Sequence, residues 1–159
     1  MVFAILTKLW GLWEATDPEE MTVGVDYHLQ RIALRSGMVV ILDEGLLSKL
    51  RLRRFVSEEE HQAIRYACLE AYRLVGEYSG FSQLEVDQLF WHLGRSCCHQ
   101  DHEPACGPRA PCSWRDGCSL MEASDYSCPG SCPLDGVCRA SLDLGMAKLM
   151  EPKVITFYY

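Results

Sequence analysis

Apolar and small residues recur at helical spacing between Val25 and Ser36, just before Gly37. The positions three or four residues apart are Val25, Leu29, Ile32, Ala33 and Ser36. Such spacing places these side chains on one face of a helix. Asp26 lies where the first turn should begin, and Gly37 follows as a C-terminal cap. The pattern therefore predicts a helix over about residues 25–36.

Two further helices are indicated by capping boxes, in which a serine is followed three residues later by a glutamate. The first box is Ser57-Glu58-Glu59-Glu60, and its helix should run to about Tyr78 and stop at Gly80. The second is Ser82-Gln83-Leu84-Glu85, and its helix should end between Gly94 and Ser96. We expect that second helix to bury Leu84, Leu89, Phe90 and Leu93.

The remaining apolar segments are shorter. Residues 1–13 are apolar, with Lys8 inside the run rather than before it, which favours a buried helix over a secretory signal. A chain that is helical from its first residues suggests the later part of a larger domain. Residues 142–150 predict a short helix, while 38–42 fit a strand or an apolar loop and 154–159 a strand or a frayed end. The predicted class is mostly α, a helical bundle domain with a C-terminal cysteine-rich metal-binding loop.

Composition limits the class of protein further. The 159 residues are 48% apolar and 23% charged, which excludes wholesale disorder, collagen and a coiled-coil rod. No run of about 18 uncharged apolar residues occurs, so no membrane span is expected. The net charge of -7 argues against nonspecific coating of nucleic acid, but a local basic cluster stands out at Lys49, Arg51, Arg53 and Arg54.

Cysteine is the compositional outlier. Eight of the nine cysteines lie between Cys97 and Cys138, together with five of the seven prolines. Proline lacks the amide donor that a helix interior requires, so this stretch cannot form a long helix. We expect a loop that is ordered by cross-links or by metal. The chain then divides into a helical domain (1–96), a cysteine-rich loop (97–138) and a C-terminal helix with a tail (139–159).

Cys128, Cys132 and Cys138 lie close together in a proline-stiffened loop, SCPGSCPLDGVC. Closely spaced thiolates suit a tetrahedral sulfur site that holds zinc or an iron–sulfur cluster. Cys98 is the preferred fourth ligand because it directly follows a helix end. The competing positions are Cys97, Cys106, Cys112 and Cys118. The last three are separated by five residues each and, with His99 or His102, predict a second metal site, most simply zinc.

A disulfide network is the alternative interpretation, since clustered cysteines with proline and glycine are typical of small secreted scaffolds. The odd total of nine, the lack of a secretory signal and a helical part large enough for its own core favour metal. Cys68 lies inside the helix after Ser57 and is expected to be an ordinary core residue.

The string from Val23 to Gly37, VGVDYHLQRIALRSG, resembles the helix-hairpin-helix (HhH-GPD) DNA glycosylases of the endonuclease III type. In that family the pattern V-D-x-H-x-x-R-x-x-x-R-x-G carries the catalytic aspartate, and a C-terminal C-x6-C-x2-C-x5-C loop binds a [4Fe–4S] cluster. CPLDGVC matches the last spacing, the middle gap is three residues, and the first gap, from Cys98 to Cys128, is much longer. The resemblance covers residues 23–37 and 91–138.

The resemblance implies a base-excision repair enzyme, a DNA N-glycosylase or abasic-site lyase, with Asp26 as its catalytic carboxylate. It implies a [4Fe–4S] cluster on Cys98, Cys128, Cys132 and Cys138, with zinc as the alternative metal. DNA, or another nucleic acid or nucleoside, would be the partner of an intracellular protein, cytoplasmic or in the nucleoid or nucleus. Lys49, Arg51, Arg53 and Arg54 would contact the DNA backbone, or would form a solvated loop.

Other positions of the resemblance are left open. Arg31 and Arg35 could pair with carboxylates or contact phosphate, and His28 is expected in the core. The family's DNA-gripping turn, similar to Leu-Pro-Gly-Ile-Gly, does not occur before Asp26, and no lysine follows such a turn. The second hypothesis is a noncatalytic, zinc-binding interaction module in which Asp26 only caps its helix.

Overall fold

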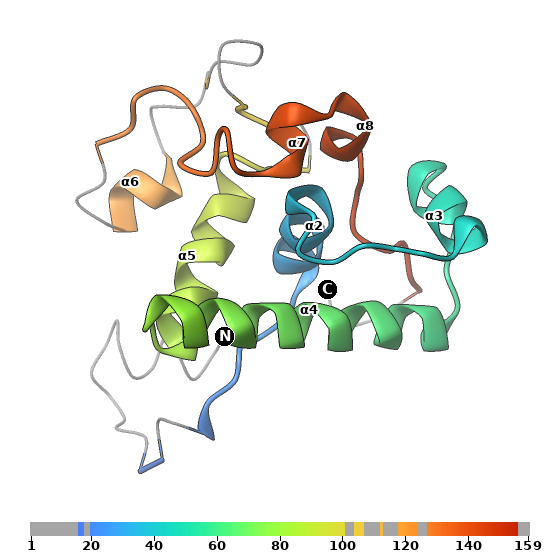
Figure 1. Cartoon of the computed structure of the whole chain (residues 1–159), viewed down its shortest axis with the longest axis horizontal. Coiled ribbons are helices and arrows are strands. Elements are labelled where there is room, and N and C mark those ends of the chain that lie inside the picture. Colours follow the sequence, from blue (N-terminus) through green and yellow to red (C-terminus); the bar gives the residue numbers. More distant parts are fainter. Residues whose placement is uncertain are drawn as a thin grey trace.

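The computed structural model describes residues 16–17, 20–100, 104–106, 112, 118–123 and 127–155. This part of the chain is mostly helical, as expected, and Figure 1 shows how its helices are arranged. In chain order the helices are α2 (Tyr27–Ser36), α3 (Glu44–Arg51), α4 (Glu58–Ser79), α5 (Gln83–Arg95), α6 (Ser119–Ala123), α7 (Arg139–Leu142) and α8 (Leu144–Ala147). The described residues form no strand, although Phe55 and Lys153 make an isolated parallel bridge.

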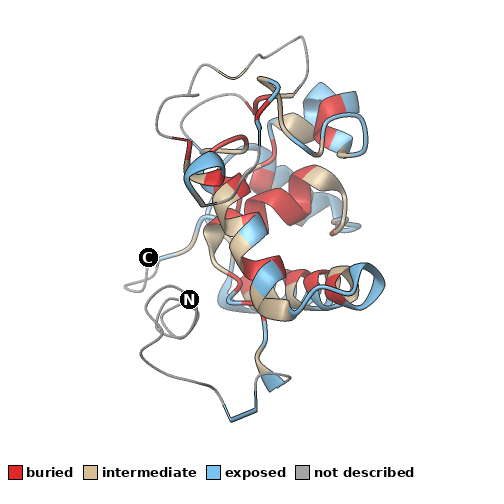
Figure 2. Ribbon diagram, turned by 90° about the vertical axis from the view of Figure 1, so that its left-hand side faces the viewer, coloured by how far each residue is buried: buried red, intermediate tan, exposed pale blue. Residues whose placement is uncertain are grey.

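Helix α2 lies at the centre of the fold. The long helix α4 and helix α5 contact it on two sides, and α7 and α8 contact it from the C-terminal part of the chain (Figure 1). Every residue from His28 to Arg35 is buried, and Figure 2 shows the buried residues gathered in the middle of the molecule. The boundaries were predicted correctly: the Asp26 side chain accepts a hydrogen bond from the Leu29 amide, and Gly37 ends the helix with φ of 81°.

Both predicted capping boxes are present. Ser57 and Glu60 cap α4, which ends at Gly80, and Ser82 and Glu85 cap α5. The expected core face of α5 was wrong in part, because Leu84 is only half-buried and Leu89 is 38% exposed. Val86 is buried instead, on the same face as Phe90 and Leu93, four and seven residues later.

Helix α3 was not predicted. The Asp43 side chain accepts a hydrogen bond from the Leu46 amide and begins the helix, but Leu50 is its one buried residue. One buried residue in two turns gives too little periodicity to indicate a helix from sequence. Residues 38–42 form a loop, one of the two predicted alternatives.

The helix predicted over residues 142–150 is shorter than expected: α8 covers residues 144–147, and the separate helix α7 ends at Leu142, where the prediction begins. Asp143 has extended backbone angles between them, and its side chain accepts a hydrogen bond from the Gly145 amide, so that it begins a new helix. The apolar segment 1–13 lies outside the described residues, as do residues 156–159 of the tail. None of the described helices is long and apolar enough to cross a membrane.

Candidate functional site

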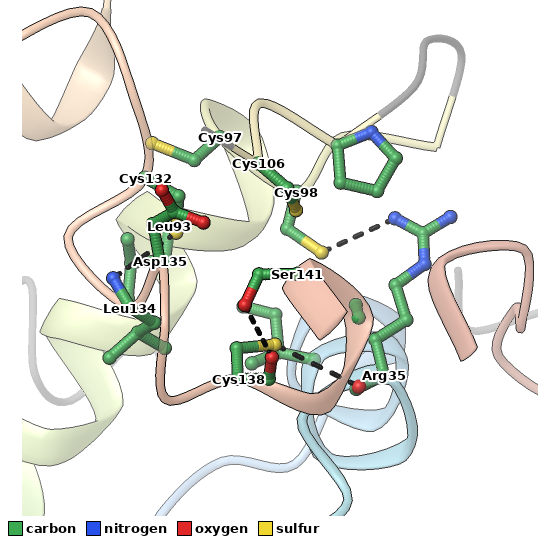
Figure 3. A pocket seen from close by; sticks show the side chains of 13 residues that line it. Arg35, Leu93, Cys97, Cys98, Cys106, Cys132, Leu134, Asp135, Cys138 and Ser141 are labelled. Atoms are coloured by element: carbon green, nitrogen blue, oxygen red, sulfur yellow. Dashed lines mark hydrogen bonds between the residues drawn. The ribbon is translucent and has the colours of Figure 1, made fainter. Parts of the chain in front are cut away.

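Five cysteines from three separate segments line one small pocket between α2, α5 and the C-terminal loop. Cys97 and Cys98 directly follow the end of α5, Cys106 lies in the next segment, and Cys132 and Cys138 lie in the loop before α7. Figure 3 shows these side chains together with Arg35 of α2. We call this site the cysteine pocket; its volume is about 20 Å³, enough for about one water-sized sphere.

Backbone hydrogen bonds hold the three segments of the cysteine pocket together. The Ala105 amide donates to the Cys97 carbonyl at 2.8 Å, and the Cys132 amide donates to the Ala105 carbonyl at 2.7 Å. The Cys98 amide donates to the Leu93 carbonyl of α5 at 2.9 Å. The short segment around Ala105 therefore bridges the end of α5 to the C-terminal loop, and thiols far apart in sequence come into one place.

Arg35 provides the positive charge at this pocket. Its Nη1 atom donates to the Cys98 Sγ atom at 3.2 Å, and its Nε atom donates to the Leu149 carbonyl at 2.7 Å. The Cys138 Sγ atom lies 3.8 Å from the Arg35 carbonyl oxygen, so both ends of this residue contact the pocket (Figure 3). Arg35 therefore connects α2 to two of the thiols of the pocket.

Burial and mutual contacts change the proton affinities of these thiols. The hydrogen bond with Cys132 lowers the pKa of Cys97 to about 7, and the same bond raises the pKa of Cys132. Burial raises the pKa of Cys106 to about 11 and also raises the pKa of Cys138. The pocket therefore favours the neutral form of Cys106, Cys132 and Cys138, and several thiolates together would require a cation among them.

The structure brings three of the four predicted metal ligands into one pocket. Cys98, Cys132 and Cys138 line the pocket, whereas Cys128 is buried outside it, where its Sγ atom accepts from the Gly130 amide at 3.3 Å. Cys106 lines the pocket, whereas Cys112 and Cys118, its expected partners in a second site, do not. The only sequence signals for Cys97 and Cys106 were their positions among the competing ligands.

All nine cysteines are free thiols, so no disulfide bond supports the alternative of a disulfide network. Among the described residues, no group of three or more His, Cys, Asp and Glu side chains is arranged to hold a metal ion. Cys68 is fully buried in α4, as expected, and burial raises its pKa to about 12.

Asp26 lies at the opposite end of α2 from the Arg35–Cys98 contact. Its Oδ1 atom accepts from the Leu29 amide at 3.1 Å, and nearby Asp87 accepts from the Gly24 amide at 2.9 Å. Burial raises the pKa of Asp26 against the effect of the amides, and the charge of Asp87 raises it further. The carboxylate is therefore both a helix cap and a stronger base than an exposed aspartate.

Arg31 has a structural role in the core. Its side chain is fully buried and forms an ion pair with Glu151, with 2.9 Å between Nη1 and Oε2. It also donates to the Cys98 and Gly94 carbonyls at 2.8 and 2.9 Å. Of the two roles left open for Arg31, the carboxylate pair is the one present. Arg31 ties α2 to the end of α5 and to the C-terminal segment.

His28 is buried, as expected, and its Nδ1 atom lies 2.9 Å from Arg31 Nη2. Burial and then the charge of Arg31 lower its pKa from 6.5 to about 4. Folding therefore favours the neutral ring, which stabilises the protein at neutral pH. This contribution is lost as the pH falls from about 6.5 through 4, since the unfolded chain takes up the proton first.

We expect this histidine to contribute about 3 kcal/mol less to the free energy of unfolding at pH 4 than at pH 7. Urea unfolding across this range, compared between the wild type and His28→Gln, isolates the contribution because the other ionisable groups are common to both. If the free energy of unfolding changed with pH in the same way in both proteins, the pKa of His28 would be the same in the folded and unfolded chains. That result would contradict the prediction.

The four residues of the predicted basic cluster differ in their contacts. Lys49 forms an ion pair with Glu60 at 2.6 Å, and Arg53 donates to the Glu151 carbonyl at 2.6 Å. Arg51 and Arg54 are exposed. Two of the four cations, Lys49 and Arg53, are therefore engaged in contacts within the chain.

Comparison with known proteins gave no match: no family model, no curated protein and no solved structure is similar to this chain.

Proposed function

We propose that the protein is an endonuclease III-like DNA N-glycosylase that holds a [4Fe–4S] cluster in the cysteine pocket and uses Asp26 to break the bond between base and sugar. The contact between Arg35 and Cys98 supports this proposal most. Arg35 belongs to the motif around Asp26, and Cys98 belongs to the cysteine-rich stretch. The two stretches that resemble the family are distant in sequence, yet they meet in one site.

The positions of the motif also have consistent physical roles. Asp26 begins α2, Arg31 and Arg35 are buried along it, and Gly37 ends it in the left-handed conformation that favours glycine. A pattern that matched by chance would not be expected to place two buried arginines against the cysteine-rich stretch. These contacts give each charged residue of the motif, Asp26, Arg31 and Arg35, a structural partner.

Asp26 has properties suited to glycosidic bond cleavage. Departure of the base builds positive charge on the sugar, and a fixed carboxylate stabilises that charge more in the transition state than in the ground state. A carboxylate whose pKa is raised by burial is also better able to accept a proton from an attacking water. Carboxylates have the same two roles in glycoside hydrolysis.

We assign the cluster to Cys98, Cys106, Cys132 and Cys138, with Cys106 in place of Cys128. These four thiols line the cysteine pocket, and Arg35 lies beside Cys98. A cluster bound there would cross-link the loop to the end of α5 and stabilise the fold. Cys97 would remain close by, in its hydrogen bond with Cys132.

A zinc-binding interaction module remains the second candidate, and the size of the pocket favours it. A pocket of about 20 Å³ suits a single ion, while a [4Fe–4S] cluster would require the thiols to move outward. In this alternative Asp26 serves only as the cap of α2, a role that its hydrogen bond with Leu29 already provides.

Metal analysis of anaerobically purified full chain tests the metal and its ligands together. We expect iron and inorganic sulfide in equal amounts, with the brown colour of an iron–sulfur cluster. Cys106→Ser should lose most of the bound iron, because serine lacks the thiolate ligand. Cys128→Ser is the matched control and should keep it, because Cys128 lies outside the pocket.

The opposite result, iron lost in Cys128→Ser and kept in Cys106→Ser, would contradict our ligand assignment and restore the set expected from sequence. One zinc ion for each chain without iron would favour the interaction module. Protein free of any metal would contradict both candidates. The catalytic part of the proposal is tested separately by Asp26→Asn, which removes the charge and keeps a helix cap.

A further inference from the structure

Of the five thiols that line the cysteine pocket, Cys97 is the one that the assigned cluster leaves out. It is 2% exposed, so solvent hardly reaches it. Its thiol shares a hydrogen bond with the thiol of Cys132, which is half-buried in the loop before α7. Figure 3 shows both side chains at the same pocket. Two thiols from distant segments are therefore in contact, and one of them has no role in the proposed function.

The backbone holds these two cysteines near each other. One residue, Ala105, bonds to both: its amide donates to the Cys97 carbonyl at 2.8 Å, and its carbonyl accepts from the Cys132 amide at 2.7 Å. The Leu134 amide donates to the Cys132 Sγ atom at 3.4 Å, which orients that sulfur. Two sulfurs in hydrogen-bond contact need to approach by only about 2 Å to reach the S–S bond length of about 2.0 Å. Rotation of side chains provides a movement of this size.

We propose that Cys97 and Cys132 form an oxidation site, at which a peroxide converts the two neighbouring thiols into a disulfide. Cys132 is the more exposed of the two, so it meets the oxidant first. The pocket that both residues line has a volume of about 20 Å³, so the oxidant must be small, and hydrogen peroxide is the simplest that fits this requirement. Cys97, enclosed beside Cys132, then serves as the resolving thiol.

The two steps balance with hydrogen peroxide as the oxidant. The Cys132 sulfur attacks one peroxide oxygen, the O–O bond breaks, and the thiol proton leaves with the released hydroxide as water, which gives a sulfenic acid (S–OH). The Cys97 sulfur then attacks the Cys132 sulfur, the S–O bond breaks, and the Cys97 proton leaves with the hydroxide as a second water. One peroxide is reduced to two waters, and two thiols are oxidised to one disulfide.

The oxidation site would also control metal binding, a consequence that rests on the proposed function. Cys132 belongs to the assigned ligands, and a sulfur held in a disulfide is not a thiolate ligand. A chain that carries the disulfide should therefore bind no cluster until a reductant such as dithiothreitol restores the thiols. Bound metal should in turn protect Cys132 from peroxide. Formation of the disulfide itself requires neither metal nor Asp26.

Mass spectrometry of the peroxide-treated full chain tests the inference. The chain is used as purified and after treatment with a chelator, and circular dichroism checks that its helices are retained. After peroxide, free thiols are blocked by alkylation and the chain is digested without reductant. We expect the peptide that contains Cys97 to be linked to the one that contains Cys132, and dithiothreitol should release the link. The same treatment in urea should give mixed pairs, because unfolding separates the two thiols.

Variants identify the two sulfurs. Cys97→Ser should lose the link, and Cys132 should instead accumulate the sulfenic acid, which dimedone traps, because no thiol resolves it. Cys132→Ser should lose the link as well. Cys98→Ser is the matched control for Cys97→Ser, since it changes the adjacent residue and should keep the link. Cys128→Ser is the control for Cys132→Ser, because Cys128 lies in the same loop but outside the pocket.

Two results would overturn the inference. One is a linked pair of equal yield in Cys97→Ser or in Cys132→Ser, which would place the disulfide elsewhere. The other is a folded chain in which peroxide produces no link between Cys97 and Cys132. Failure of the proposed function is recognised separately. A chain that binds no metal when purified anaerobically, but forms this link, contradicts the cluster and supports the oxidation site.

Discussion

Asp26→Asn is expected to lower the rate of base release from DNA about 100- to 1000-fold, the usual cost of removing one group that stabilises charge in a transition state. The amide cannot stabilise a cationic sugar or accept a proton from water. Asparagine caps helices as well as aspartate does, so α2 should still begin at Tyr27. Single-turnover release of the base, measured on duplexes that each carry one damaged or mismatched base, gives the rate.

Asp43→Asn is the matched control for this prediction. Asp43 caps α3 with the same hydrogen bond, from the Leu46 amide at 2.7 Å, but lies outside the family motif. Its substitution should leave the rate within about twofold of the wild type, while both variants keep their melting temperatures. A rate unchanged in Asp26→Asn would show that the residue is a cap alone and would favour the interaction module.

Arg31→Met is expected to lower the free energy of unfolding by about 3–5 kcal/mol, because breaking a buried ion pair leaves an uncompensated charge. Glu151 would keep only its longer contact with Arg53, at 3.4 Å. The Gly94 and Cys98 carbonyls would each lose a donor at the same time. A domain of ordinary stability, about 5–15 kcal/mol, would lose a large fraction of it. Urea unfolding at neutral pH measures the change.

Arg73→Met is the control on the surface of α4. Arg73 forms ion pairs with Glu70 and Glu77, both at 2.8 Å, but its side chain is 50% exposed. Its substitution should lower the free energy of unfolding much less than Arg31→Met does, because water screens exposed ion pairs. The double variant Arg31→Met with Glu151→Gln should recover part of the lost stability, because the buried carboxylate is removed along with its partner. Equal effects of Arg31→Met and Arg73→Met would contradict the structural role of Arg31.

Local signals in the sequence predicted the ends of three helices. Asp26 and Gly37 limit α2, and a serine–glutamate capping box begins α4 and another begins α5. These signals work because a cap satisfies backbone groups within three or four residues of itself. The face of α5 was predicted less well, since Leu84 and Leu89 are as apolar as Val86. Which of them is buried depends on where the neighbouring helices lie.

Which cysteines line the cysteine pocket depends on contacts between residues far apart in the chain, and sequence spacing does not encode these contacts. Cys128 has the shorter sequence distance to Cys132, but Cys106 lines the pocket because the Ala105 backbone hydrogen-bonds to Cys97 and Cys132. Glu151 and Cys98, which contact Arg31 or Arg35, lie more than 60 residues from them along the chain. Helix α3 was missed for a related reason, because it buries little and its position is set by its surroundings.

Patterns along the chain were enough to predict a mostly α-helical protein, the ends of α2, α4 and α5, and the core position of Cys68. Short-range hydrogen bonds and the amphipathic period fix these features, so neighbouring residues are enough to predict them. Packing between distant segments sets which thiols share a pocket, that Arg31 pairs with Glu151, and that the buried Gln30 acceptor has no partner among the residues that the structure describes. Those features arise where segments far apart in the chain pack together, and their chemistry depends on the burial that packing imposes.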